Sequence, residues 1–213
     1  WSLKVEFVDS NNKNIISNIN ILDNKKIDKF SFRNKEEINK AISIINKKKF
    51  SITDISSKII NRNPSGPFTT STLQQTASSR LGFGASRTMQ IAQKLYQGIE
   101  IEGETIGLIT YMRTDGTNLS KDAVSAFRDY IKKEIGNEYL PESSLNYSGK
   151  KAKNAQEAHE AIRPTDIIRT PLSVKKCLST DQNKLYDLIW SRALSSQMSS
   201  AKFDRNTITV TSD

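Results

Sequence analysis

The chain has 213 residues, and 32 lysine and arginine side chains against 23 aspartate and glutamate side chains give it a formal net charge of +9. Its one cysteine, Cys177, excludes an internal disulfide and a cysteine metal cluster and fits a reducing compartment. No apolar run is long enough to span a membrane. The basic balance is typical of proteins with polyanionic partners such as nucleic acid, although many basic proteins bind none.

Residues 1–63 are rich in Asn, Lys, Ile and Ser. Their apolar patterns predict three strands and one helix: strands over 1–7, 15–22 and 50–60, and a helix over 35–47. Asn34 is placed to cap this helix, because a short polar side chain there can accept a hydrogen bond from the first turn.

The segment Asn63-Pro64-Ser65-Gly66-Pro67 is the clearest boundary, because two prolines and a glycine break any regular element. Beyond it, apolar residues at helical spacing predict five helices: 68–81, 86–97, 121–135, 156–163 and 180–198. Ser86 and Ser120 are candidate caps. An acidic turn is expected over 98–105. A last strand over 203–211 is expected to rejoin the β portion of the chain.

The stretch from Gly107 to Ser120 contains the main candidates for reactive side chains. A strand-like apolar run over 106–109 leads into a polar turn that carries Thr110, Tyr111, Arg113 and Asp115. A hydroxyl, a phenol, a guanidinium and a carboxylate therefore meet where a strand ends, which is a common position for a functional site.

Tyr111 is the candidate nucleophile. A phenol has a pKa of about 10, so its attack on phosphorus needs a proton acceptor and nearby cations. Arg113 lies two residues further on, and in an extended segment its guanidinium points to the same side and can bind the same phosphate. The alternatives are a packing role for Tyr111 and an ordinary ion pair between Arg113 and Asp115.

His159 is the one histidine of the chain. It is either a phosphate ligand or proton-transfer group near the site, or a structural residue of a short helix. Glu157 and Glu160 flank it, and without a second histidine this cluster is weak as a metal site. We interpret the two glutamates as helix-surface or supporting groups.

Taken together, three blocks resemble the bacterial DNA topoisomerase I family of type IA topoisomerases. The blocks are Pro67–Gln75 with Leu81–Gly84, Gly107–Ser120, and Gln156–Pro164. With the patterns above, the resemblance implies an α+β fold. In it a mainly helical catalytic domain of helix-turn-helix or winged-helix type is inserted into a partial β-rich domain. The implied domains are a strand-gate portion over 1–63, the catalytic-tyrosine domain over 64–200 and a return strand over 201–213.

The resemblance also implies roles for individual residues. Tyr111 attacks a single-strand phosphodiester, forms a 5′-phosphotyrosyl link and frees a 3′-hydroxyl. Arg113 holds the scissile phosphate, and His159 assists near it. The other implied DNA contacts are Thr110, Asp115 and Arg163. Gly116 stands where serine is common in the family, which removes a hydroxyl but leaves the nucleophile.

The implied activity is relaxation of negatively supercoiled DNA without ATP, by passage of one strand through a transient break. Mg²⁺ is expected on a Toprim domain of the same polypeptide and not within this chain. The implied partners are single-stranded and negatively supercoiled DNA and that Toprim domain, with no membrane, in the bacterial cytoplasm at the nucleoid. Because both ends fall in strand-like patterns, we expect a fragment that does not relax DNA alone.

Two other readings are open. The helix pairs and the charge also fit a non-catalytic helix-turn-helix DNA-binding module. A tyrosine recombinase also links DNA to tyrosine, but there the tyrosine follows the arginine and histidine motifs. Here Tyr111 precedes His159, which argues against a recombinase.

Overall fold

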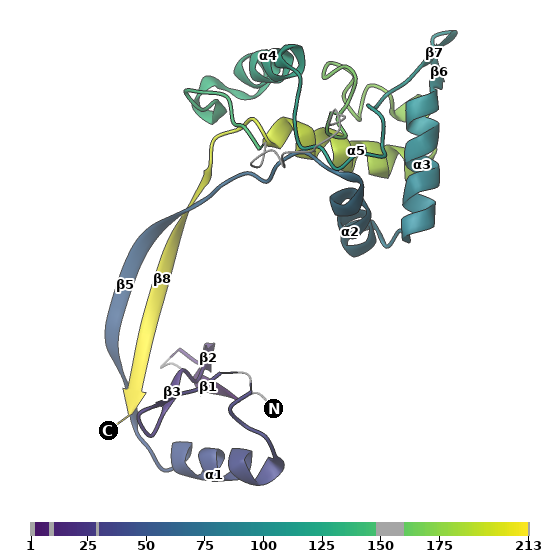
Figure 1. Ribbon diagram of the computed structural model, residues 1–213. Coiled ribbons are helices and arrows are strands. Elements are labelled where there is room, and N and C mark those ends of the chain that lie inside the picture. Colours follow the sequence, from purple (N-terminus) through teal and green to yellow (C-terminus); the bar gives the residue numbers. More distant parts are fainter. Residues whose placement is uncertain (1–2, 9–10, 29, 148–159, 213) are drawn as a thin grey trace, which may run out of the picture. The chain divides into compact units, whose positions relative to one another are not determined.

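The computed structural model describes residues 3–8, 11–28, 30–147 and 160–212. Helices and strands are mixed along the chain, so the predicted α+β class is confirmed (Figure 1). The chain forms two compact units, residues 1–58 with 204–213 and residues 59–203. The finer winged-helix description and the proposed domain assignments stay predictions.

The first unit contains two small hairpins and one helix. Its elements are β1 (Lys4–Val8), β2 (Asn14–Asn18), β3 (Ile21–Leu22), β4 (Lys25–Lys26) and α1 (Lys35–Ile45). β1 and β2 are antiparallel, as are β3 and β4, so the single strand predicted over 15–22 is wrong and is divided between two hairpins. Asn34 caps α1 as predicted, its side chain accepting from the Glu37 amide.

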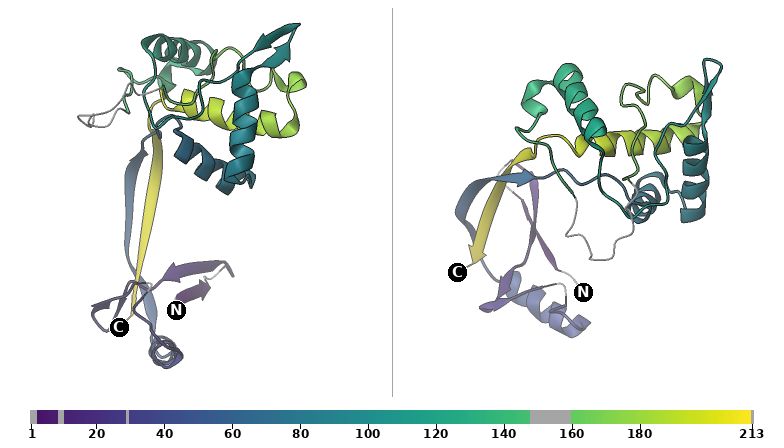
Figure 2. Two further views of the ribbon diagram at one scale, coloured as in Figure 1. Left: turned by 45° about the vertical axis from the view of Figure 1, so that its right-hand side comes forward. Right: turned by 45° about the horizontal axis from the view of Figure 1, so that its top comes forward.

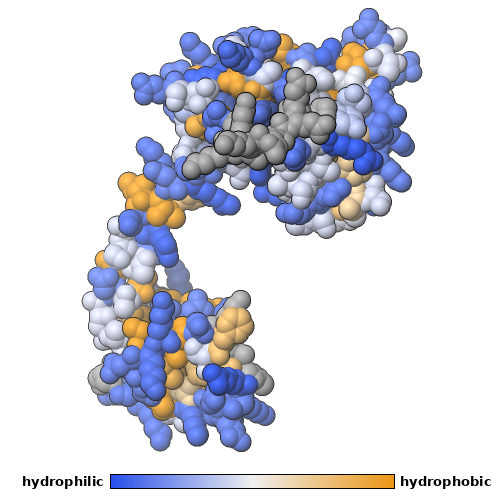
Figure 3. Space-filling model, viewed as in Figure 1, coloured by the Kyte–Doolittle hydropathy of each residue, from blue (hydrophilic) through white to orange (hydrophobic). Residues whose placement is uncertain are grey.

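Two long strands, β5 (Phe50–Arg62) and β8 (Ala201–Ser212), pair in a two-stranded sheet. The boundary between the units falls within both strands. Hydrophobic surface is visible along this part of the chain in Figure 3. Several apolar side chains of the two strands are exposed: Ile52, Ile55, Ile59 and Ile208.

In its described part, the second unit contains four α-helices, of which α5 is the longest, and one hairpin. Its main elements are α2 (Thr70–Leu81), α3 (Ala85–Gln97), β6 (Ile99–Ile101), β7 (Glu104–Ile106), α4 (Lys121–Tyr130) and α5 (Thr180–Ser195). Three short turns complete it: a π-helical turn η1 (Ile131–Ile135) and the 3₁₀ turns η2 (Asn137–Tyr139) and η3 (Lys175–Cys177).

Helix α5 organises the core of this unit, and Figure 2 shows it beside the other helices in two views. Its Leu185, Tyr186 and Ile189 are fully buried in the cluster formed with α2 and α3. Further along, Ala193 and Leu194 pack in a second cluster with α4. One helix therefore holds both halves of the unit together through apolar burial.

The corner between α2 and α3 differs from the prediction in two ways. Helix α2 begins at Thr70 and not at Phe68, because Phe68 is buried and forms an isolated β-bridge with Ile162. Helix α3 is capped by Gly84, so the prediction that Ser86 is the cap is wrong. Gly82 ends α2 in the left-handed region, with φ 69°, as glycine commonly does there.

Several other elements differ from the predicted ones. The turn predicted over 98–105 is the β6–β7 hairpin. Of the strand-like run over 106–109, Ile106 ends β7, and the rest is irregular apart from a bridge between Ile109 and Pro164. Residues 160–163 are not helical, which contradicts the described part of the helix predicted over 156–163. None of the described helices is long and apolar enough to cross a membrane.

Candidate active site

The segment around Tyr111 is fixed on one side by the first residue of α2. The Thr70 hydroxyl lies 2.8 Å from the Met112 carbonyl oxygen and 3.1 Å from that of Thr114. The same hydroxyl accepts from the Thr114 amide at 2.8 Å, and the Thr70 amide donates to the Thr114 carbonyl at 2.8 Å. One threonine thus satisfies backbone groups on both sides of Arg113.

The other side of the segment is held by residues 161–165. The Thr110 amide donates to the Arg163 carbonyl at 2.9 Å, and its hydroxyl donates to the Ala161 carbonyl at 2.7 Å. The Arg163 amide in turn donates to the Thr110 hydroxyl at 3.0 Å. The structure therefore brings the second and third sequence blocks together, and it places Thr110 as a residue that joins them.

Between these two supports, buried and exposed residues alternate along the chain. Met112, Thr114 and Gly116 are buried, whereas Tyr111, Arg113 and Asp115 are exposed. Exposure alternates in this way although the backbone bends at Thr110, Met112 and Arg113 and forms no strand. The phenol, the guanidinium and the carboxylate therefore all reach the surface of the unit, and the Tyr111 side chain is 38% exposed.

The Tyr111 ring is supported by helix α3. Its centroid lies 5.4 Å from that of the Tyr96 ring, in an edge-to-face arrangement with an interplanar angle of 65°. Gly107 allows the chain to pass close to the end of α3, because a Cβ at that position would lie 2.7 Å from the Tyr96 carbonyl oxygen. This contact was not predicted, because it joins two segments of the chain and no local sequence pattern marks Tyr96 as a neighbour of Tyr111.

Arg113 faces a polar cavity of about 960 Å³ that is lined from α2, α3 and α5. The other charged and amide side chains around it are Gln74, Arg87, Gln90, Gln93, Lys94, Gln97 and Asp181. Arg87 is paired with Asp181. None of the ion pairs among the described residues involves Arg113 or Asp115, so the alternative of an Arg113–Asp115 pair is not formed there.

Arg163 is engaged within the protein. Its Nε and Nη2 donate to the two carboxylate oxygens of Glu160 at 3.1 and 2.8 Å, and its Nη1 donates to the Pro164 carbonyl at 2.9 Å. The Ser120 amide also donates to Glu160. Burial works to raise the pKa of Glu160, but the hydrogen bonds from Arg163 and Ser120 outweigh it, and the pKa is lowered. These contacts tie the third block to the start of α4.

The family model described as DNA topoisomerase matches residues 1–213, which is the whole chain.

The chain belongs to the DNA topoisomerase family.

Similar proteins agree with this membership, which the sequence blocks predicted. The chain is 45% identical over 213 residues to the DNA topoisomerase 1 of Rickettsia bellii, covering 100% of this chain and 26% of that protein. It is 48% identical over 183 residues to the Haemophilus influenzae DNA topoisomerase 1, covering 86% and 20%. It therefore spans about a quarter or less of these curated relatives.

A solved structure supports the same membership at the level of the fold. The full-length topoisomerase I from Thermotoga maritima superposes with a TM-score of 0.68 at 37% sequence identity. The superposition covers 87% of this chain and 29% of that one.

In this topoisomerase-family chain, His159 and Glu157 are outside the described residues, so the predicted place of His159 at the phosphate stays a prediction. Within the described residues, no three His, Cys, Asp or Glu side chains gather into a group that could hold a metal ion. The predicted Mg²⁺ site elsewhere in the polypeptide also stays a prediction.

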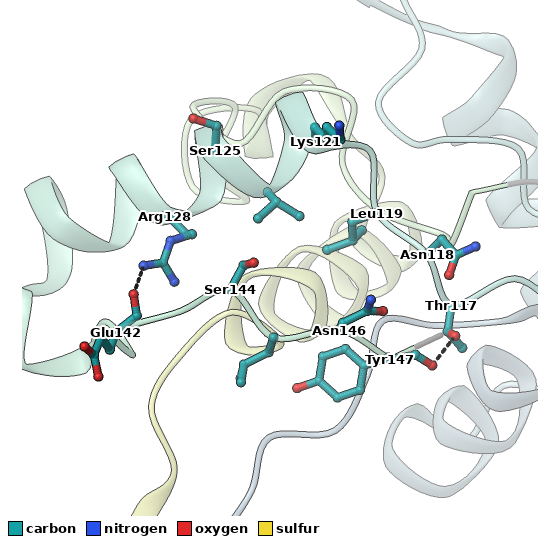
Figure 4. A pocket seen from close by; sticks show the side chains of 12 residues that line it. Thr117, Asn118, Leu119, Lys121, Ser125, Arg128, Glu142, Ser144, Asn146 and Tyr147 are labelled. Carbon is teal, nitrogen blue, oxygen red and sulfur yellow. Dashed lines mark hydrogen bonds between the residues drawn. The ribbon is translucent and has the colours of Figure 1, made fainter. Parts of the chain in front are cut away.

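A second cavity, of about 640 Å³, lies beside the turn that follows Asp115 (Figure 4). Thr117 donates from its hydroxyl to the Tyr147 carbonyl at 2.8 Å. Arg128 donates from Nη2 to the Pro141 and Glu142 carbonyls at 2.9 and 3.3 Å. These hydrogen bonds end on backbone carbonyls, so they position the turn and α4 against residues 141–147.

Proposed function

We propose that this chain carries the nucleophilic half of a type IA topoisomerase, which cleaves and rejoins one DNA strand through a 5′-phosphotyrosyl intermediate. The observation that supports this most is the exposed Tyr111 and Arg113 on a segment supported from both sides. A phenol and a guanidinium two residues apart can reach the same phosphate, and the hydrogen bonds from Thr70 and Thr110 fix the backbone that carries them.

The reaction is a transfer of one ester bond. The Tyr111 oxygen attacks phosphorus, a P–O bond to tyrosine forms, and the bond from phosphorus to the 3′-oxygen breaks. The phenol loses its proton, and the 3′-oxygen takes up one proton, directly from the phenol or through solvent, and becomes a hydroxyl. Arg113 donates to the non-bridging oxygens and offsets the negative charge that grows in the transition state.

Rejoining reverses these bonds. The freed 3′-hydroxyl attacks the phosphotyrosine and restores the phosphodiester, so the energy of the broken bond is kept and ATP is not needed. His159 assists near the phosphate, and Asp115, Thr110 and Arg163 support the strand or the turn. For Thr110 and Arg163 the described hydrogen bonds favour the supporting role.

The whole protein relaxes negatively supercoiled DNA by passing a strand through this break, in the bacterial cytoplasm at the nucleoid. A Toprim domain of the same polypeptide binds the Mg²⁺ that the reaction needs. Its acids complete the site that Tyr111 and Arg113 begin.

The test is Tyr111→Phe in the full-length parent enzyme, with Tyr96→Phe as the matched control. Tyr111→Phe keeps the ring contact and removes the attacking oxygen, so cleavage of a labelled single strand should be abolished while binding is retained. Tyr96→Phe removes a neighbouring phenol and should leave cleavage within a few-fold of the parent. Unchanged relaxation by Tyr111→Phe would favour the non-catalytic helix-turn-helix reading instead.

A further inference from the structure

A third cavity, of about 910 Å³, lies in the second unit and shares no lining residue with the stretch from Gly107 to Ser120. Its walls come from the end of β5, from α2 and α5, from η2 and from the start of β8. The walls are tied together, since the Ser199 amide donates to the Tyr139 carbonyl at 2.8 Å and the Ser200 hydroxyl donates to Asn63 at 2.7 Å.

The cavity is strongly cationic. Four basic side chains line it, Arg62, Arg80, Arg192 and Lys202, against the single carboxylate of Glu138. Among the described residues, none of the four forms an ion pair with a carboxylate. A concave surface lined by one sign of charge concentrates ions of the opposite sign.

Arg192 is the best-placed of these groups. Its Nε donates to the Gly66 carbonyl at 2.6 Å, and its guanidinium lies 4.9 Å from the centre of the buried Phe68 ring. These contacts hold the side chain in place and leave its terminal nitrogens for another acceptor. Burial, and after it the neighbouring Arg80 charge, lowers the pKa of Arg192, which shows that the two guanidinium groups act on each other.

The cavity also offers an aromatic surface. The Tyr139 side chain lines it and is 47% exposed. Cations that follow a phosphate backbone, next to an exposed aromatic ring on which a base can stack, are the combination by which proteins bind single strands without reading their sequence.

From these features we infer that the cavity lined by Arg62, Arg80, Arg192 and Lys202 is a second binding site for single-stranded DNA. It takes the phosphodiester backbone on its cations and one base on Tyr139. The site goes beyond the proposed cleavage function, because none of its residues acts on the scissile bond. It would hold a part of the substrate away from Tyr111.

The test compares two triple variants of the 213-residue chain with equal loss of charge. The cavity variant is Arg62→Gln, Arg80→Gln and Lys202→Gln, all exposed side chains, so that the packed Arg192 is left in place. The control is Lys132→Gln, Lys175→Gln and Lys184→Gln, which are exposed cations of the same unit outside this cavity. Circular dichroism and thermal unfolding check that both variants fold like the parent.

Binding of a fluorescein-labelled oligothymidine is followed by anisotropy over a range of salt concentrations. The cavity variant should bind more weakly, and its log–log salt slope should fall by about 2, since each lost phosphate contact to a single strand contributes about 0.7. The control should keep the parent's slope. Equal losses in the two variants, or no loss in the cavity variant, would overturn the inference.

Two further arms separate the possible ligands. Tyr139→Leu should weaken oligothymidine binding about five-fold or more with no change in slope, because stacking is not electrostatic. Unchanged affinity would contradict a stacked strand. If inorganic phosphate at constant ionic strength raises the unfolding temperature of the parent but not of the cavity variant, while both bind oligothymidine equally, the site takes free phosphate and the inference is wrong. The Tyr111 side chain does not line this cavity, so a failure here leaves the cleavage proposal, which is tested by cleavage with the full-length enzyme, untouched.

Discussion

At the scale of single residues, Thr70 has the largest structural role near Tyr111. Its hydroxyl lies within hydrogen-bond distance of the backbone at Met112 and Thr114. Thr70→Val keeps the shape and removes the hydroxyl contacts to the Met112 carbonyl and to the Thr114 amide and carbonyl, which should cost about 1–3 kcal/mol in the free energy of unfolding, measured by urea titration.

Thr76→Val is the matched control for this substitution. Thr76 lies on the same helix, and among the described hydrogen bonds its side chain makes none. It should change the stability by about 0.5 kcal/mol or less. Equal losses in the two variants would mean that the Thr70 hydroxyl does not support the segment.

Glu160 makes the stability of the same region dependent on pH. Its pKa in the folded chain is below the ordinary value of 4.5, so the charged carboxylate stabilises the fold above that value. This stabilisation is lost as the pH falls through the lowered folded pKa. The difference in urea midpoint between the parent and Glu160→Gln should therefore shrink below pH 4.5. A difference that stays constant across this range would contradict the Arg163–Glu160–Ser120 network.

At the scale of elements, the α2–α3 corner gives a test with two glycines. A Cβ at Gly82 or at Gly84 would meet nothing within 4 Å, so only the backbone differs between them. Gly82 has φ 69°, and Gly82→Ser should cost about 1 kcal/mol. Gly84 is an extended N-cap without a side-chain hydrogen bond, and Gly84→Ser should add a few tenths of a kcal/mol. The unfolding temperature should therefore fall for Gly82→Ser and rise for Gly84→Ser. A shift of both temperatures in the same direction would contradict the assigned capping.

The elements also show what sequence can predict. The caps at Asn34 and Ser120 were predictable, because a cap depends on a few adjacent residues. The β6–β7 hairpin was missed because its turn places Glu102 at φ 53°, a conformation for which Glu-Gly is not the usual signal.

The site was predictable only in part. The alternation of Tyr111, Arg113 and Asp115 follows from local backbone geometry. The packing of residues 161–165 against Thr110 and Leu108 depends on contacts between distant segments, which local patterns do not carry. Residues 160–163 were assigned to a helix for the same reason, since their pairing partners lie elsewhere in the chain.

At the scale of the whole molecule, the chain spans 26% of the Rickettsia bellii relative. We predict that the purified 213-residue chain does not relax negatively supercoiled plasmid, because the proposed function assigns the metal-binding acids to another part of the polypeptide. Gel electrophoresis of plasmid topoisomers measures this. Relaxation by the chain alone would contradict the division of the site between two domains.

The proposed function places the covalent bond to DNA on Tyr111. The most direct measurement is to trap the full-length parent enzyme on a single strand, digest the adduct with protease and nuclease, and locate the modified residue by mass spectrometry. We expect a nucleotide attached through its 5′-phosphate to the peptide that contains Tyr111, and no adduct in Tyr111→Phe. An adduct on another residue, or a linkage through a 3′-phosphate, would contradict it.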